Sequence, residues 1–203
     1  MTPDDLARRI RERQVKANPD RRFLVALAGP PASGKSTLAE HLAGQLQPGA
    51  RVVPMDGFHY DDAVLVPRGL RPRKGAPETF DAHGFLHLIR RLRSEPEVAI
   101  PIFDRDMELS RAAAAIIGPQ DRILIVEGNY LLLEAEPWRQ LAPLFDLTVF
   151  LEVEEPELVR RLTARWHHHG KTEAEARAWI EGNDLPNALT VLRQSRPAEI
   201  VVK

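Results

Sequence analysis

The sequence contains no cysteine among its 203 residues. This absence excludes disulfides, thiolate metal sites and a cysteine nucleophile. It also fits a reducing compartment, so we expect a cytoplasmic location. Long apolar runs are missing as well. No stretch approaches the roughly 20 apolar residues that cross a bilayer, and residues 1–20 lack the apolar segment of a signal peptide. We therefore expect no membrane insertion.

An excess of either charge is missing too, because 28 Lys and Arg residues face 29 Asp and Glu residues. Without a basic excess the chain has no overall attraction for nucleic acid, so we expect no nucleic-acid partner, and any basic site must be local. Repeats, low-complexity tracts and linkers are also absent, which predicts a single domain over residues 1–203.

The most specific signal is residues 29–36, which read GPPASGKS and match the phosphate-binding pattern G-x-x-x-x-G-K-[ST] completely. Glycines at both ends let the backbone approach a polyphosphate, Lys35 can reach its β- and γ-phosphates, and the Ser36 hydroxyl can ligate Mg²⁺. An apolar run precedes the segment and a helical pattern follows it, which is the required order of strand, loop and helix. A chance glycine turn before a helix is the alternative. The predicted nucleotide-binding residues are Gly29, Ala32, Ser33, Gly34, Lys35, Ser36 and Thr37.

Predicted strands in this chain end in carboxylates, which is where open α/β sheets bind their ligands. Asp56 and Asp104 each follow a short apolar strand, and Glu127 lies at the end of the apolar strand 122–128, with Asn129 at the same rim. In phosphate-loop enzymes an acid at such a position lies beside Mg²⁺ and its water shell. A turn-forming strand end is the alternative interpretation of Asp56.

Residues 57–80 show little periodicity and hold the basic run Arg68, Arg71, Arg73 and Lys74. A long irregular segment within a compact domain is usually a binding loop, so we interpret 57–80 as an acceptor-binding loop whose basic groups can meet an anionic substrate or product. A solvated cluster of exposed charges is the alternative, and it stays open.

Helix-capping residues predict the start of four helices. They are Thr2 with Asp5, Asp81, Thr172 with Glu175, and Asp184. Pro186 is expected to break the helix that begins at Thr172. Residues 112–118 stay open between a short strand and a helical turn. Residues 167–169 are three consecutive histidines that point in different directions on a helix, so we interpret them as a solvated helix end.

Four segments together resemble the uridine kinase, pantothenate kinase and phosphoribulokinase branch of the P-loop kinases. They are residues 29–36, 55–59, 74–81 and 126–128, and the resemblance extends from about residue 23 to 187. Within that branch the chain looks closest to bacterial proteins named fructose transport system kinases. The resemblance implies a three-layer α/β/α P-loop NTPase fold with a five-stranded parallel core sheet in the order 2-3-1-4-5. It also implies a helical lid at about 160–175, ATP and Mg²⁺, and transfer of the γ-phosphoryl of ATP to a hydroxyl.

The same resemblance implies roles for individual residues. Asp56 would accept the proton of the attacking hydroxyl, and Lys35 and Arg165 complete the catalytic group. Arg161, Arg165 and Lys171 correspond to the basic lid that closes on the phosphates. The implied metal ligands are Ser36 and Glu127. The predicted substrate-binding residues are His59, Arg68, Lys74, Asp81, Asp104, Arg111 and Asn129.

Residues 103–111 depart from the uridine kinase pattern, because they are one residue longer and lack the histidine that reads the base. We therefore do not expect uracil recognition, and a sugar such as fructose or another polyol fits better as the small-molecule hydroxyl acceptor. A nucleoside or pantothenate stays open, and Arg68, Arg71 and Arg73 keep a nucleoside monophosphate open. An ATP-binding regulatory switch associated with transport is the alternative of another class. A homodimer also stays open.

Overall fold

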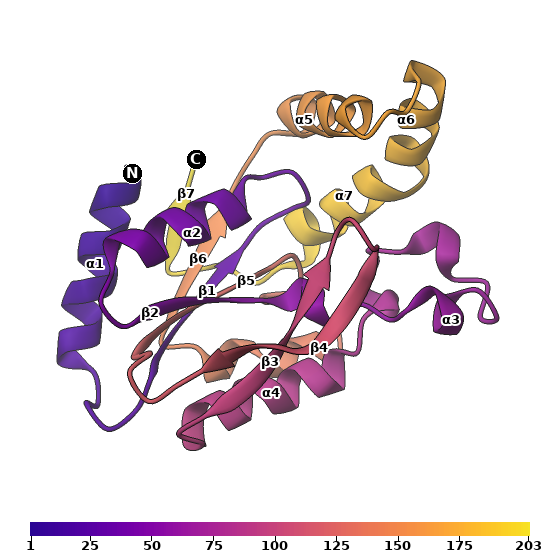
Figure 1. Cartoon of the computed structure of the whole chain (residues 1–203). Coiled ribbons are helices and arrows are strands. Elements are labelled where there is room, and N and C mark those ends of the chain that lie inside the picture. Colours follow the sequence, from indigo (N-terminus) through magenta and orange to yellow (C-terminus); the bar gives the residue numbers. More distant parts are fainter.

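The computed structural model describes all residues, 1–203 (Figure 1). Its centre is a sheet of five parallel strands that lie in the order β2-β5-β1-β6-β7. Counted along the chain within this sheet alone, the order is 2-3-1-4-5, as the family resemblance implied. The strands are β1 (Phe23–Ala28), β2 (Ala50–Pro54), β5 (Ile123–Gly128), β6 (Leu147–Leu151) and β7 (Ile200–Val202).

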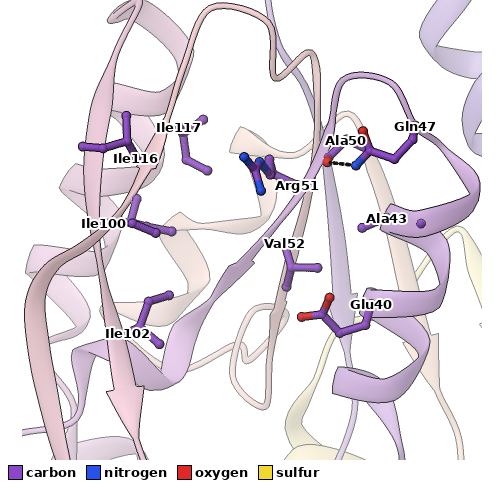
Figure 2. Close-up of a pocket in the computed structure, with 12 residues that line it drawn as sticks. Glu40, Ala43, Gln47, Ala50, Arg51, Val52, Ile100, Ile102, Ile116 and Ile117 are labelled. Carbon is purple, nitrogen blue, oxygen red and sulfur yellow. Dashed lines mark hydrogen bonds between the residues drawn. The ribbon is translucent and has the colours of Figure 1, made fainter.

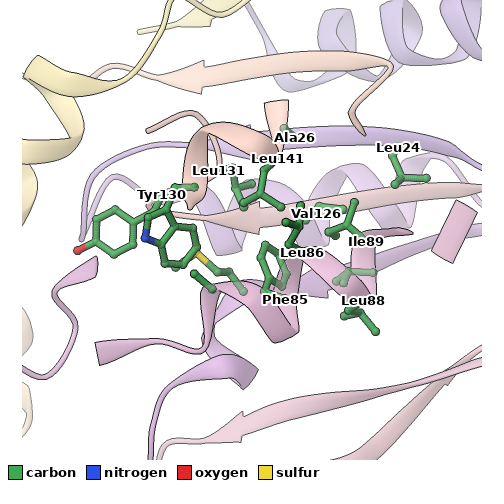
Figure 3. Close-up of a cluster of buried hydrophobic side chains, with 14 of the residues drawn as sticks. Leu24, Ala26, Phe85, Leu86, Leu88, Ile89, Val126, Tyr130, Leu131 and Leu141 are labelled. Atoms are coloured by element: carbon green, nitrogen blue, oxygen red, sulfur yellow. The ribbon is translucent and has the colours of Figure 1, made fainter. Parts of the chain in front are cut away.

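Helices cover both faces of this sheet. They include α1 (Pro3–Lys16) and α2 (Lys35–Gln45) on one face and α4 (Ala82–Ser94) on the other. Side chains alternate between the two faces of a strand, so alternate residues of β1 belong to two separate apolar clusters. Leu6 and Leu42 lie in the first cluster, and Phe85 and Ile89 of α4 lie in the larger second one (Figure 3). The predicted three-layer architecture is therefore confirmed.

A second, antiparallel sheet lies outside the parallel one. It is the hairpin of β3 (Val98–Asp104) and β4 (Leu109–Ile117). Residues 112–118, which the sequence left open, are therefore strand for most of their length. The register shifts between Ile100 and Ile102, where Pro101 has no N–H to donate to the ladder. Figure 2 shows a groove with two walls. Ile100 and Ile102 of the hairpin line one wall, and residues of α2 and β2 line the other.

Residues 57–80, called the acceptor loop from here on, run between β2 and α4. The loop region contains only short helical turns: η1 (Met55–Phe58), α3 (Asp62–Leu65), η2 (Arg71–Arg73) and η3 (Pro77–Thr79). Two buried side chains from elsewhere bind its backbone. The Tyr130 hydroxyl donates to the carbonyl of Gly75 at 2.6 Å, and the Asn183 amide donates to the carbonyl of Lys74 at 2.9 Å. The loop is thereby held to the end of β5 and to the C-terminal helices.

The C-terminal part consists of α5 (Glu155–His168), α6 (Glu173–Trp179), the π-helical turn η6 (Ile180–Asp184) and α7 (Leu185–Gln194). Two further short turns, η4 (Trp138–Gln140) and η5 (Ala142–Leu144), precede β6. The predicted capping boxes at Thr2 and Thr172 are both present. The histidines at 167–169 are exposed at the end of α5, as predicted. None of the helices combines the length and apolar character that a membrane span requires.

Two expectations for the C-terminal helices are wrong. Asp184 does not cap α7, because its own backbone is helical and its carboxylate instead accepts the indole N–H of Trp166 at 2.6 Å. Pro186 does not break the helix. It lies in the first turn of α7, directly after the π-helical turn, where the missing N–H of proline costs least.

Arg22, directly before β1, joins several loops at the amino end of the sheet. Its buried guanidinium donates hydrogen bonds to five backbone carbonyls at the end of α4 and before β5. These carbonyls belong to Leu92, Glu95, Pro96, Gly118 and Asp121. A single charged side chain thereby satisfies backbone groups that no helix or strand pairs.

Candidate active site

The phosphate loop joins β1 to α2 and has the backbone that the sequence pattern requires. Gly34 has a φ of 92°, a left-handed conformation that glycine adopts without strain. A Cβ on Gly29 would lie 3.1 Å from the backbone oxygen of Leu151, so the loop packs closely on β6. No side chain caps the N-terminus of α2. Its first N–H groups therefore remain available to an anion, as in known phosphate sites.

The predicted metal ligands lie together beside this loop. The Ser36 hydroxyl donates to a carboxylate oxygen of Glu127 at 3.2 Å, and Glu127 is only 5% exposed. Burial raises the pKa of Glu127, and the neighbouring Lys35 opposes that rise. Burial also lowers the pKa of the Lys35 ammonium, while Glu127 and Asp56 oppose that change. A hydroxyl and a carboxylate are oxygen donors of the kind that Mg²⁺ prefers, so the residues present fit the metal.

Asp56 lies in η1, directly after β2, at the carboxyl edge of the sheet next to Glu127 of β5. Its carboxylate accepts a hydrogen bond of 2.7 Å from Arg105, and its backbone carbonyl lies 2.9 Å from Nδ1 of His59. Burial alone would raise the pKa of Asp56, but His59, Arg105 and Lys35 outweigh it and hold the pKa below its ordinary value. The carboxylate is therefore ionised at neutral pH and able to accept a proton.

Two of the three predicted lid residues lie at the nucleotide site. Arg161 of α5 donates to the carbonyl of Ser33 at 3.0 Å, and Glu157 holds its guanidinium from the other side at 2.7 Å. Arg165 lies one turn further along α5, and its charge acts on Asp56 and Lys35. The third residue, Lys171, is not brought to the loop. Its ammonium lies over the rings of Trp166 and Trp179, at 5.2 and 5.5 Å from their centroids.

The predicted substrate-binding residues divide into two groups. His59 is in the site, with its ring 4.0 Å from that of Phe80 and 4.8 Å from that of Phe103. Asn129 follows β5, and its Oδ1 is buried without a hydrogen-bond partner from the protein.

The other predicted substrate residues contact other groups of the protein, although Arg68 and Arg111 donate no hydrogen bond to it. Lys74 is 8% exposed and bonds Asp62 at 2.9 Å. Asp81 accepts the N–H of Gly84 at 2.8 Å as the cap of α4, as predicted. Three further contacts are those of Asp104 with the Met107 N–H at 3.0 Å, of Arg111 with Asp104 at 3.5 Å, and of Arg68 with the Tyr60 ring at 5.5 Å.

Sequence reasoning missed Arg105. It lies in the turn between β3 and β4, and the hairpin folds back so that its guanidinium reaches Asp56, 49 residues earlier in the chain. The only signal for it was its position just after a strand that ends in Asp104. Without the hairpin pairing, that position does not indicate which carboxylate Arg105 meets.

Comparisons with known proteins identify the family. A family model described as "AAA domain" matches residues 25–181, which is most of the chain. The protein YggC of Escherichia coli (strain K12) is 38% identical over 192 residues, covering 92% of this chain and 79% of that protein. The chain belongs to this family of P-loop kinases.

Other members of the P-loop kinases match along most of the chain. "Putative uridine kinase C227.14" of Schizosaccharomyces pombe is 35% identical, with 90% of this chain and 83% of that protein covered. The crystal structure of a "putative fructose transport system kinase" from Silicibacter sp. TM1040 is 45% identical and superimposes with a TM-score of 0.95 over 100% of both chains. YFH7 of Saccharomyces cerevisiae, at 20% identity and a TM-score of 0.86, shares the fold.

Proposed function

We propose that the protein is an ATP-dependent kinase that transfers the γ-phosphoryl of ATP to a hydroxyl of a small molecule. The observation that carries the proposal is the position of Asp56. Its ionised carboxylate lies in the same charge cluster as Lys35 of the phosphate loop and the metal ligand Glu127. Phosphoryl transfer needs this pairing of an anion cradle with a carboxylate that orients the nucleophile.

The residues have separate tasks in this reaction. The phosphate loop and Lys35 hold the triphosphate, and Ser36 and Glu127 would hold Mg²⁺, which neutralises phosphate charge when bound. The oxygen of the acceptor hydroxyl bonds to the γ-phosphorus, and Asp56 accepts the proton of that hydroxyl. The bond between the γ-phosphorus and the oxygen that leaves with ADP breaks. Arg165 lies on the lid side, where its charge stabilises the transferring phosphoryl.

For the acceptor, the proposal names a chemical class. We favour a sugar such as fructose over a nucleoside or pantothenate, supported by the missing base-reading histidine in residues 103–111 and by the name of the Silicibacter relative. All residues in the mechanism come from one chain, so the proposal requires no second subunit. It assigns the reaction to the cytoplasm, which supplies ATP and Mg²⁺.

A thermal-shift screen followed by one substitution tests the proposal. Sugars, nucleosides and pantothenate are added with Mg²⁺ and a non-hydrolysable ATP analogue, and stabilisation identifies an acceptor. Asp56→Asn should then lower kcat by at least about 100-fold with unchanged affinity for the analogue. Asp106→Asn is the matched control, because Asp106 is exposed and forms no ion pair. A full transfer rate in Asp56→Asn contradicts the role of Asp56. Slow ATP hydrolysis with no acceptor would favour the regulatory switch.

A further inference from the structure

The turn of the β3–β4 hairpin, residues 105–108, brings Arg105 to Asp56 but has few contacts of its own. Outside the hairpin, only two side chains bond it. Asp56 accepts a hydrogen bond from Arg105 at 2.7 Å, and Lys74 of the acceptor loop bonds Glu108. An exposed turn with so few contacts does not fix a long side chain by itself, so the contact with Lys74 bears on where Arg105 lies.

The ammonium of Lys74 is buried, with its side chain only 5% exposed, and all its donors are used. Its three N–H groups match three oxygens. These are Oδ1 of Asp62 at 2.9 Å, and the carbonyl oxygen and Oε1 of Glu108 at 3.0 and 3.3 Å. The ammonium also lies 5.5 Å from the ring centroid of Phe103 in β3. Lys74 therefore joins the acceptor loop to both the strand and the turn of the hairpin.

Glu108 is the residue of the turn that most needs such a partner. Its φ is 55°, in the left-handed region that is unfavourable for a residue other than glycine. A backbone of this kind persists where the surrounding structure holds it, and Lys74 binds both the carbonyl and the carboxylate of Glu108. Lys74 is itself held, because its carbonyl accepts the amide of Asn183 at 2.9 Å. Without the ammonium, the turn that carries Arg105 could relax.

The other cations of the acceptor loop contact groups within the loop itself. They are Arg68, Arg71 and Arg73, whose partners are Tyr60, Asp62 and Glu78. Lys74 is the one arginine or lysine of the loop whose contacts reach the hairpin.

We propose that Lys74 is a positioning residue, which holds the hairpin turn so that Arg105 keeps Asp56 in place for phosphoryl transfer. This inference rests on the proposed kinase function and adds a residue to it. Lys74 acts through Glu108 and Arg105 and does not bind the acceptor, in contrast to the substrate-binding role that the sequence suggested for it.

Lys74→Met tests the inference, because it keeps the length of the side chain and removes the ammonium. The former partners Asp62 and Glu108 are 41% and 53% exposed, so water can solvate them and the fold should survive. The matched control is Glu78→Gln, which removes an ion pair of the same loop that does not reach the hairpin. Thermal unfolding of each variant checks the fold.

The expected result separates kcat from KM. With the acceptor found by the screen, Lys74→Met should lower kcat by about 10- to 100-fold, as a displaced reacting group does, and leave the KM for ATP unchanged. Lys74→Arg keeps the charge and the donors and should recover part of the rate. Glu78→Gln should keep the wild-type rate. A loss confined to the KM for the acceptor overturns the inference, because Lys74 would then bind substrate.

A double-mutant cycle with Arg105→Gln shows whether Lys74 acts through Arg105. In the Arg105→Gln background, Lys74→Met should lower kcat by no more than about twofold, since the side chain that it positions is already gone. The same fold-loss in both backgrounds contradicts the inference, because Lys74 would then act independently of Arg105.

The ¹H–¹⁵N NMR signal of the Arg105 Nε–H, assigned by its loss in Arg105→Gln, is a readout that needs no activity. Asp56→Asn gives the signal of Arg105 without its ion pair. Lys74→Met should move the wild-type signal toward that position, and Glu78→Gln should not. An unchanged signal in Lys74→Met refutes the positioning role. If the signal moves but the wild-type protein phosphorylates no acceptor, the positioning of Arg105 stands and the proposed kinase function fails.

Discussion

Replacing Gly57 by alanine tests whether the contact between η1 and the hairpin sets the position of Asp56. Gly57 follows Asp56 directly, and a Cβ at this position would lie 2.4 Å from the backbone oxygen of Pro101 in β3. Ordinary van der Waals contact begins at 3.4 Å, so the two segments must separate by about 1 Å. Since the obstructing atom belongs to the backbone, no side-chain rotation relieves the clash.

The magnitude follows from that displacement. We expect Gly57→Ala to lower the free energy of unfolding by about 1–3 kcal/mol, the usual cost of overpacking. The same shift moves Asp56 relative to Arg105, and a misplacement of about 1 Å at a reacting centre costs on the order of 100-fold in rate. Affinity for an ATP analogue should stay unchanged, because the phosphate loop joins β1 to α2 and does not depend on η1.

Three measurements check this prediction: chemical denaturation, kcat with the acceptor found by the screen, and titration of the ATP analogue. Gly44→Ala is the matched control. Gly44 is exposed on α2, and no atom lies within 4 Å of the place that a Cβ would take, so this change should raise stability by up to about 1 kcal/mol and preserve the rate. Wild-type stability and rate in Gly57→Ala would refute the reasoning, because the hairpin would then not fix Asp56.

Three further predictions concern charged and polar groups. Arg22→Ala should destabilise the protein by about 3–5 kcal/mol in chemical denaturation, because buried backbone carbonyls lose their donor; a loss below about 1 kcal/mol would contradict that role. Ser36→Ala should weaken binding of an ATP analogue at least about tenfold with Mg²⁺ and much less in EDTA, and an equal loss in both conditions would argue against a metal ligand. Arg160 and Arg161 lower the pKa of Glu157 to about 2, so the stability gained over Glu157→Gln should be fully present above pH 4.5, the ordinary pKa of a glutamate, and disappear as pH falls toward 2. Glu157 is exposed, so salt should weaken that gain, and a difference that grows below pH 4.5 would refute it.

The parts of the molecule that sequence reasoning predicted are those whose signals are local. The phosphate loop needs particular residues within eight positions, because glycine backbone, Lys35 and Ser36 act on one anion. The parallel core follows from buried strands such as β1, in which all six residues are buried. The capping boxes are local as well, since Thr2 and Asp5 satisfy backbone groups of the same helical turn.

The parts that it missed depend on contacts between distant segments. Residues 112–115 are a run of alanines, with no periodicity to separate strand from helix, and they became strand by pairing with β3. The contacts of long cationic side chains are harder still to predict, because a lysine or arginine can reach several neighbours and the fold decides which of them it contacts. The ammonium of Lys171 lies over two indole rings, whereas Lys74 forms an ion pair with Asp62 and Arg105 forms one with Asp56.

The π-helical turn η6 connects α5, the helix of the predicted lid, to the acceptor loop. Asn183 of this turn donates to the carbonyl of Lys74 in the acceptor loop, and its neighbour Asp184 accepts the indole N–H of Trp166 in α5. In a regular α-helix, successive side chains are rotated by about 100° around the helix axis. The π-helical turn is wider, so it changes the directions in which Asn183 and Asp184 point. Any closure of α5 over the phosphates must therefore carry η6 with it or break the Trp166–Asp184 bond. Since Asn183 of η6 also binds the acceptor loop, a displacement of α5 that kept the Trp166–Asp184 bond would be transmitted through η6 to the backbone of Lys74.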